Sequence, residues 1–254
     1  MVFPIGDDNT GRRTTPVVTY VLIAINVLVF VLFQGFGSND EFTYKFSTVP
    51  QEIVTGEDVA RPVAIRDPLT NQQVGVIEHQ PTPVSVYLTL LTSMFMHGGL
   101  MHLLGNMLFL WIFGDNVEDD LGRGRYLAFY LITGLIASLS HVFMNTSGAN
   151  ALIPSLGASG AISGVLGGYL VMHPHRRVRV LMLRVLTEVP GYVAVGLWFV
   201  FQLINSLGFL GGGSQEGGGV AYAAHIGGFI AGLVLVKFFA LGHNTGGHSP
   251  PARA

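Results

Sequence analysis

Six long apolar stretches alternate with segments rich in glycine, proline and charged residues along the 254-residue chain. An α-helix needs about 20 apolar residues to cross roughly 30 Å of hydrocarbon, and most of these stretches approach or exceed that length. The pattern therefore predicts an all-α membrane protein with six spans, at residues 16–34, 100–114, 126–146, 157–172, 190–209 and 220–241. The second and fourth spans are short, so we expect neighbouring helices to surround them.

The polar connections differ in length and composition. Residues 35–86 carry seven acidic residues, three basic residues and five of the 12 prolines, and we expect local structure there, including a hairpin of residues 63–65 with 74–77. Residues 211–219 contain six glycines, which is typical of a flexible loop. The chain thus divides into an N-terminal segment (1–15), one membrane domain (16–241) and a polar tail (242–254) that we expect to be disordered.

Composition supports a polytopic membrane protein. Only 11% of the residues are charged, against roughly 25% in soluble domains, and the mean hydropathy is +0.52. The absence of cysteine excludes disulfides and thiol catalysis. The net charge is −2, and the arginines of residues 176–184 are explained by lipid headgroups, so we expect membrane lipids and no nucleic acid among the partners.

The basic residues favour one orientation in the membrane. With the N-terminus in the cytoplasm, ten of them fall on the cytoplasmic side and three on the external side, which predicts cytoplasmic termini and an even number of spans. The first apolar run lacks a small-residue cleavage site, and no long transit-like sequence precedes it. We therefore expect a retained first span in a bacterial plasma membrane.

Polar residues near the start of three spans suggest chemistry. Ser159, His225 and the pair His102 and Asn106 begin the fourth, sixth and second spans, which all run inward, so the four side chains share a shallow depth below the outer surface. Buried polar groups are costly in hydrocarbon, and a serine beside a histidine forms a nucleophile with its base. This pattern predicts hydrolysis inside the membrane.

Small residues flank the serine and the histidine. Gly160 and Gly164 recur four residues apart in the fourth span, and Gly228 and Gly232 share one helical face with His225 in the sixth. Such stripes let helix backbones approach closely, which a serine and a histidine on different helices require. The alternative is that the glycines serve packing alone.

His102 and Asn106 lie four residues apart and project from one helical face, where both can donate hydrogen bonds. Together with the Ser159 amide they could bind the oxyanion of acyl transfer, although an interhelical hydrogen bond is an equal alternative for Asn106. No carboxylate occurs at this depth, so the expected catalytic unit is a Ser–His dyad. We expect no metal site, because no His-Glu-x-x-His motif is present and His173 and His175 suit a turn.

The chain resembles the rhomboid family of intramembrane serine proteases. The match consists of His97-x-x-x-x-His102-x-x-x-Asn106, Gly157-x-Ser159-Gly160, and His225 followed at three and seven by Gly228 and Gly232. These motifs occur in order at corresponding spans, and the resemblance covers residues 16–241. Gly-x-Ser-Gly alone would be weak evidence for the family.

The resemblance implies a six-helix rhomboid bundle with Ser159 as nucleophile, His225 as base, and His102, Asn106 and the Ser159 amide around the oxyanion. It implies an active site that needs no cofactor, in a water-filled cavity open to the outside. Family members cleave transmembrane helices of other proteins near their outer ends. Residues 35–86 resemble the membrane-embedded first loop, residues 211–219 resemble the cap over the site, and the fifth span resembles the helix that shifts to admit substrate.

Two positions depart from many relatives. Ser163 stands where an aromatic residue stacks on the catalytic histidine, so another residue must orient His225. Both tryptophans, Trp111 and Trp198, lie outside the first external loop, so a Trp-Arg pair is missing there. The alternatives are a non-catalytic rhomboid-like adaptor that binds transmembrane helices, and a small-solute channel. The sequence leaves the natural substrate and the oligomeric state open.

Overall fold

The computed structural model describes residues 2–66, 70, 72–182, 185–206 and 218–241. Each of the six predicted stretches corresponds to a helix: α1 (Val17–Leu28, continued by the π-helical η1, Val29–Phe33), α5 (Leu100–Leu121), α6 (Arg123–Met144), α7 (Ser159–Met172), α8 (Gly191–Ser206) and α9 (Gly218–Ala240). Three segments of the described chain are long and apolar enough to cross a bilayer, namely Leu100–Leu121, Arg123–Met144 and Tyr222–Ala240. The fold is a mostly helical bundle of a multi-pass membrane protein.

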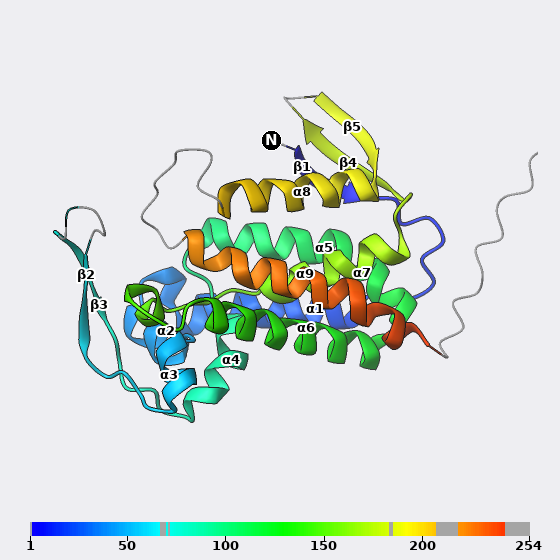
Figure 1. Ribbon diagram of the computed structural model, residues 1–254. Helices are drawn as coiled ribbons and strands as arrows, with labels where there is room; N and C mark the ends of the chain where they lie inside the picture. The colour runs from blue at the N-terminus through cyan, green and yellow to red at the C-terminus, as the bar shows by residue number, and fades with distance from the viewer. Residues whose placement is uncertain (1, 67–69, 71, 183–184, 207–217, 242–254) are drawn as a thin grey trace, which may run out of the picture.

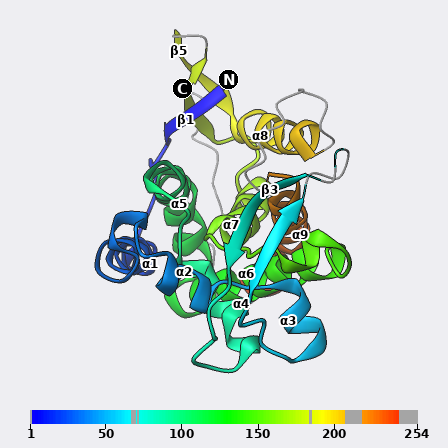
Figure 2. The ribbon, with the colours of Figure 1, turned by 90° about the vertical axis from the view of Figure 1, so that its left-hand side faces the viewer.

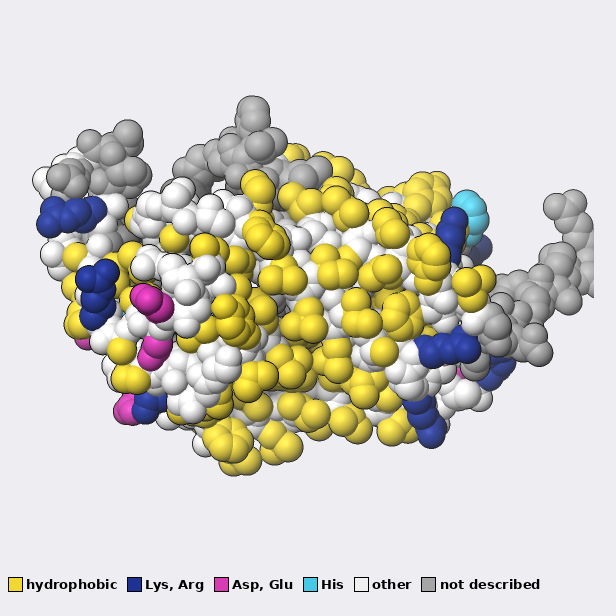
Figure 3. Space-filling model, turned by 60° about the horizontal axis from the view of Figure 1, so that its bottom comes forward, with side chains coloured by type: hydrophobic (Ala, Val, Ile, Leu, Met, Phe, Trp, Pro, Cys, Tyr) yellow, Lys and Arg dark blue, Asp and Glu magenta, His cyan; other side chains and the backbone are white. Residues whose placement is uncertain are grey.

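Helix α7 lies in the middle of the bundle and contacts α5, α6, α8 and α9 (Figures 1 and 2). Its 14 residues reach about 21 Å at 1.5 Å per residue, which is less than the hydrocarbon thickness. Every residue from Gly160 to Tyr169 is buried, so other helices surround this short span as the pattern predicted. Apolar side chains cover the middle of the face seen in Figure 3, and charged side chains lie at its two ends, as expected of a surface in contact with lipid.

The long connection between α1 and α5 has local structure. It contains the short helices η2 (Gly35–Gly37), α2 (Asp40–Phe46), α3 (Pro50–Thr55), η3 (Val86–Leu88), α4 (Thr89–Thr92) and η4 (Ser93–Phe95). The predicted hairpin is confirmed, since strand β2 (Pro62–Arg66) pairs antiparallel with β3 (Gln73–Glu78). An isolated bridge between Thr48 and Ser155 joins this connection to the chain just before α7. Residues of η5 (Ala149–Leu152) precede that bridge.

The prediction of an all-α protein holds for the membrane bundle but not for the whole chain. Besides the hairpin, strands β1 (Val2–Asp7), β4 (Arg177–Met182) and β5 (Val185–Pro190) form an antiparallel sheet in the order β1-β4-β5. The segment 1–15 therefore contains a strand, and of the arginines after α7, Arg177 and Arg179 lie on strand β4. Arg177, Val178, Arg179 and Val180 alternate between exposed and buried positions, which is the period of a strand. This alternation was present in the sequence.

The second predicted span ended seven residues too early. Helix α5 continues from residue 114 to Leu121 because its acidic side chains have partners there. The Glu118 carboxylate accepts hydrogen bonds from the backbone N–H groups of Val18 and Thr19, at 2.9 and 2.7 Å. These donors lie in the first turn of α1 and have no intrahelical acceptor. The carboxylate thus caps α1 while it extends α5, and the polar residues do not end the helix.

Glycines of α7 and α9 face one another across the closest helix contact. A Cβ atom on Gly228 would collide with the carbonyl oxygen of Gly160. One on Gly232 would collide with the carbonyl oxygen of Gly164 and lie 2.7 Å from its carbonyl carbon. The two backbones therefore touch where the small-residue stripes meet.

Replacing Gly232 by alanine is expected to lower the free energy of unfolding by about 1–3 kcal/mol, because the new methyl group meets backbone that cannot rotate away. Gly196 is a matched control within α8, since a Cβ atom there would meet no atom within 4 Å. Gly196→Ala should leave stability unchanged or raise it by up to about 1 kcal/mol. Thermal unfolding of both variants in one detergent measures the difference, and equal melting temperatures would contradict the close contact.

Asp7 at the end of β1 is buried in the polar cluster at the end of the bundle where the sheet lies. Its Oδ2 accepts hydrogen bonds from Asn116 Nδ2 at 2.6 Å and from Tyr169 Oη at 3.0 Å. Burial, with a contribution from the nearby Asp115, raises the pKa of Asp7 from 3.8 to about 7. Between these two values the folded chain holds a proton that the unfolded chain has released. The free energy of unfolding therefore falls as the pH rises through this window.

Asp7→Asn is expected to flatten that pH dependence, because the amide keeps an acceptor for Asn116 and Tyr169 but does not ionise. From about pH 4 to about pH 8, wild type should lose roughly 2–4 kcal/mol more than the variant. Glu52, whose pKa burial also raises to about 7, acts equally in both chains, so the difference isolates Asp7. Parallel curves of melting temperature against pH would show that Asp7 ionises freely in the folded state.

Candidate active site

Ser159 and His225 meet inside the bundle. The Nε2 atom of His225 lies 2.8 Å from Ser159 Oγ, within hydrogen-bond distance. Ser159 is the first residue of α7, and His225 lies two turns into α9. They lie 66 positions apart, and the chain between them includes a hairpin and the whole of α8, so the tertiary fold alone brings them together.

The backbone before Ser159 makes a turn that glycine permits. Gly157 has a φ of +126°, a conformation that residues with a Cβ atom rarely adopt. Its N–H donates to the Ser93 carbonyl at 2.9 Å, which fixes the turn against η4. A Cβ atom at Gly157 would also lie 2.9 Å from His102 Cε1, so a larger residue would push that histidine away. The turn places Ser159 at the positive N-terminal end of α7, where backbone N–H groups lack intrahelical acceptors.

Aromatic residues that the sequence analysis did not assign to the site surround His225. The ring of Trp198 in α8 lies 6.1 Å from the His225 ring at an angle of 45°, and Tyr222 lies 6.2 Å away, edge to face. Ser163 instead donates a hydrogen bond to the Ser159 carbonyl at 2.7 Å within α7. Trp198 and Tyr222 are thus two aromatic residues that contact the His225 ring. Tyr222 was visible three residues before His225, on the same helical face.

His102 lies beside the turn at Gly157. Its Nδ1 accepts a hydrogen bond from the Gly98 N–H at 3.3 Å, and its exposed side chain approaches Gly157 through the ring edge. His97 packs edge to face against it with ring centroids 5.1 Å apart. The buried Gln34 side chain holds this segment by donating to the His97 carbonyl and accepting from the His97 N–H, both at 2.9 Å.

Asn106 lies one turn after His102 on α5 and is 8% exposed. Within the part of the chain that the structure describes, its Nδ2 is buried and has no hydrogen-bond acceptor. No hydrogen bond between described residues joins Asn106 or His102 to Ser159. An unsatisfied buried amide lowers the stability of the fold by about 1–3 kcal/mol. Stability therefore does not explain why an asparagine stands at position 106, and a functional role does.

A small cavity of about 30 Å³ adjoins Ser159. Side chains of Ser93, Ser138 and Ser155 line it together with Gly157. Its volume and its hydroxyl groups suit one water molecule. Of the loop expected to cap the site, residues 211–217 lie outside the described residues, and Gly218 and Gly219 already belong to α9.

The fold and the site define a class of protein: a multi-pass helical membrane protein with a serine and a histidine in contact between the buried helix α7 and its neighbour α9. The Rhomboid domain model matches residues 85–241, which is more than half of the chain. The chain belongs to the rhomboid family.

Individual relatives agree with this membership. The chain is 28% identical over 216 residues to Rhomboid protein 1, mitochondrial, of Saccharomyces cerevisiae, across 85% of this chain and 51% of that protein. It is 27% identical over 220 residues to Rhomboid protease GluP of Bacillus subtilis, across 86% of this chain and 34% of that protein. Presenilin-associated rhomboid-like protein A, mitochondrial, of Danio rerio is 37% identical over 101 residues, which are 39% of this chain and 26% of that protein. The chain thus spans about half or less of the length of these relatives.

Proposed function

We propose that this protein is an intramembrane serine endopeptidase that cleaves transmembrane helices of other membrane proteins near their outer ends. The observation that carries the proposal is the 2.8 Å contact between Ser159 Oγ and His225 Nε2 in an apolar bundle. Membership of a family that includes a named rhomboid protease supports it. The substrate is a helix that enters from the bilayer, and the reaction needs no cofactor.

In the proposed mechanism His225 Nε2 takes the hydroxyl proton of Ser159 as Oγ attacks the carbonyl carbon of the scissile peptide. The protonated His225 then gives that proton to the leaving amine, which breaks the peptide bond and leaves an acyl ester on Ser159. A water molecule, deprotonated by His225, hydrolyses the ester and restores the serine. Trp198 and Tyr222 hold the imidazole in the orientation that both transfers require.

The negative charge that develops on the carbonyl oxygen is stabilised by the Ser159 N–H, Asn106 Nδ2 and His102. The free N–H groups and dipole at the start of α7 favour an anion there. The unpartnered Nδ2 of Asn106 supports this role, because a donor reserved for the transition state stays empty in the resting protein.

Cleavage of a model substrate tests the proposal. The purified chain is reconstituted in vesicles with a single-span protein, and the products are mapped by mass spectrometry. We expect one cut within or beside the apolar segment, and covalent labelling of Ser159 by a serine-reactive phosphonate. A chain that binds the substrate helix, leaves it intact and resists the phosphonate would be a rhomboid-like adaptor and not a protease.

The proposal includes an orientation with both termini in the cytoplasm, based on the ten-to-three distribution of basic residues. A reporter fused after residue 242 should be active inside the cell, and one inserted between Gly213 and Ser214 outside it. The reverse result at either site would place Ser159 near the cytoplasmic surface. The named relatives include mitochondrial and bacterial proteins, so the bacterial plasma membrane remains a prediction.

A further inference from the structure

The sheet β1-β4-β5 carries an apolar cluster on its exposed face. Phe3 pairs with Leu181, and Leu181 pairs with Leu186, so the three side chains lie side by side on one face. They are 46%, 42% and 61% exposed, and Ile5, two residues after Phe3, is 46% exposed. Pro4, Val178 and Val180 point to the other, buried face. A contiguous exposed cluster of this kind marks an interaction surface.

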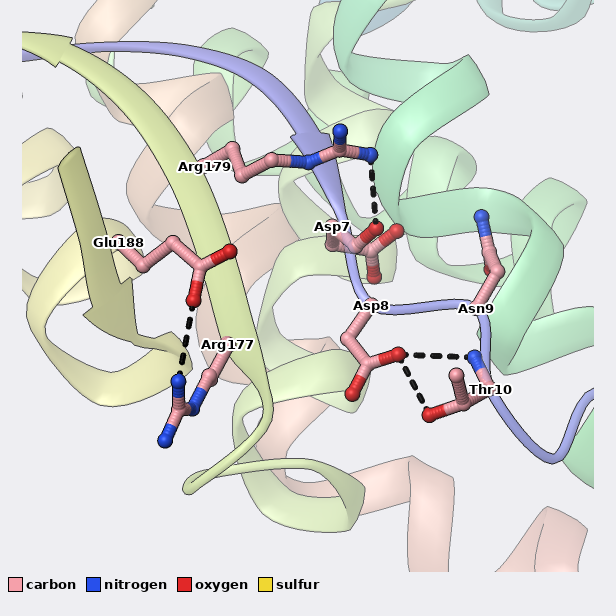
Figure 4. Close-up of a pocket in the computed structure, with 7 residues that line it drawn as sticks. All are labelled: Asp7, Asp8, Asn9, Thr10, Arg177, Arg179 and Glu188. Atoms are coloured by element: carbon pink, nitrogen blue, oxygen red, sulfur yellow. Dashed lines mark hydrogen bonds and ion pairs between the residues drawn. The ribbon is translucent and has the colours of Figure 1, made fainter. Parts of the chain in front are cut away.

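The end of the same sheet that adjoins α8, its base, carries charged side chains. Arg179 pairs with Glu188, and a cavity of about 630 Å³ opens next to them, where β1 runs into residues 8–10 (Figure 4). Arg177 and Arg179 provide guanidinium groups, and Asp7, Asp8 and Glu188 provide carboxylates. The 3.2 Å pair between Arg177 and Glu188 is solvent-exposed, so it contributes little and its groups are available to a ligand.

The charges of this cavity select a class of ligand. Two guanidinium groups share the cavity with the carboxylates of Asp8 and Glu188, so a purely anionic group would meet repulsion as well as attraction. A molecule that carries both a phosphate and an ammonium group would satisfy the arginines and the carboxylates together.

The position of the sheet points to the bilayer as the source of that ligand. The sheet contacts α8, and the β4-β5 hairpin projects sideways from the bundle beside that helix (Figures 1 and 2). Helix α8 begins at Gly191, directly after β5, and exposes apolar residues such as Leu197 and Val200. The sheet therefore lies beside a helix whose outer surface faces lipid. Its unpaired strand edges keep it at the interface and not in the hydrocarbon core.

We propose that the sheet β1-β4-β5 is a phospholipid-binding element: its exposed apolar cluster of Phe3, Ile5, Leu181 and Leu186 enters the adjacent leaflet, and the cavity at its base holds an ammonium-phosphate headgroup of the phosphatidylethanolamine type. Arg177 and Arg179 bind the phosphate. Asp8 and Glu188 accept hydrogen bonds from the ammonium group, which the quaternary ammonium of phosphatidylcholine cannot donate. The proposal depends on membrane insertion and not on proteolysis.

Fluorescence quenching tests whether the apolar cluster lies within the leaflet. The chain contains no cysteine, so Leu186→Cys can carry a single fluorophore in the full-length protein in vesicles. We expect acyl-chain-labelled lipids to quench it and aqueous iodide to leave it bright. A fluorophore on Glu188→Cys, two residues nearer the base, should show weaker quenching by the lipid label. Quenching of the fluorophore at position 186 by iodide alone, or its protection from both quenchers through contact with protein, would overturn the proposal.

Native mass spectrometry of the detergent-purified protein tests the headgroup. Phosphatidylethanolamine, phosphatidylcholine and phosphatidylglycerol with identical acyl chains are added in turn, and phosphatidylethanolamine should bind most tightly. The double variant Arg177→Gln with Arg179→Gln should weaken its binding by about tenfold or more. Lys237→Gln, an exposed basic residue of α9 outside the sheet, is the control and should bind as wild type does.

Equal binding of the three lipids by wild type would overturn the headgroup assignment without any variant. A double variant that melts as wild type does and binds phosphatidylethanolamine as well as Lys237→Gln would overturn the role of the arginines. Neither experiment measures cleavage, so the absence of lipid binding by the sheet would not contradict the protease proposal. The absence of proteolytic activity likewise would not contradict the lipid-binding proposal.

Discussion

Ser159→Ala and His225→Ala are each expected to reduce cleavage of a transmembrane substrate to the uncatalysed background. Each change removes one atom of the 2.8 Å contact through which the proton must pass. Residues that act as one catalytic unit are strongly non-additive, so the double variant should be no slower than either single variant. Cleavage rates of the three purified variants and wild type on one substrate measure the effect.

Stability separates this result from a folding defect. Ser159 is only partly buried at a helix start, so Ser159→Ala should melt within about 1 kcal/mol of wild type. Ser163→Ala offers a matched control on the same helix, because its hydroxyl bonds to the Ser159 carbonyl and takes no part in the proton transfer. That variant should retain most of the activity. Clear cleavage by purified Ser159→Ala would reject the dyad.

Asn106→Ala is expected to lower kcat by about 10²-fold or more, which corresponds to about 2.7 kcal/mol of transition-state stabilisation. The reason is that Nδ2 has no partner among the described residues of the resting protein and would acquire one only when the oxyanion forms. Substrate affinity should barely change, since the donor acts only in the transition state. Single-turnover rates with the enzyme in excess over the substrate show whether the loss lies in the chemical step, without interference from product release.

Asn26 provides the structural comparison for this prediction. It is also a buried helical asparagine, but its Nδ2 donates to the Leu22 carbonyl at 2.8 Å within α1. Asn26→Ala should therefore cost about 0.6–2 kcal/mol of stability and keep its turnover per folded molecule. An Asn106→Ala protein that behaves in the same way, destabilised but catalytically normal, would remove Asn106 from the oxyanion site.

The apolar stretches were the most informative part of the sequence. Helix positions followed from length and hydropathy alone, because hydrocarbon requires every backbone group of a span to be satisfied within that span. The end of α5 did not follow, because Glu118 and its acidic neighbours indicate the end of an apolar span. Only the structure shows that the Glu118 carboxylate is paired with the N–H groups of Val18 and Thr19. The strand β4 was missed for a different reason. Its two-residue alternation was short, and the arginines had a sufficient explanation in lipid headgroups.

By itself the sequence determined the helical membrane class, the glycine stripes and the residue types at the candidate site, because these depend on composition and on helical spacing. Only the tertiary structure decided that His225 reaches Ser159, that Trp198 from another helix lies beside the imidazole, and that β1 pairs with β4. These are contacts between residues separated by 27 to 180 positions along the chain. Local propensity holds no information about them, since they form only when the buried helices have packed.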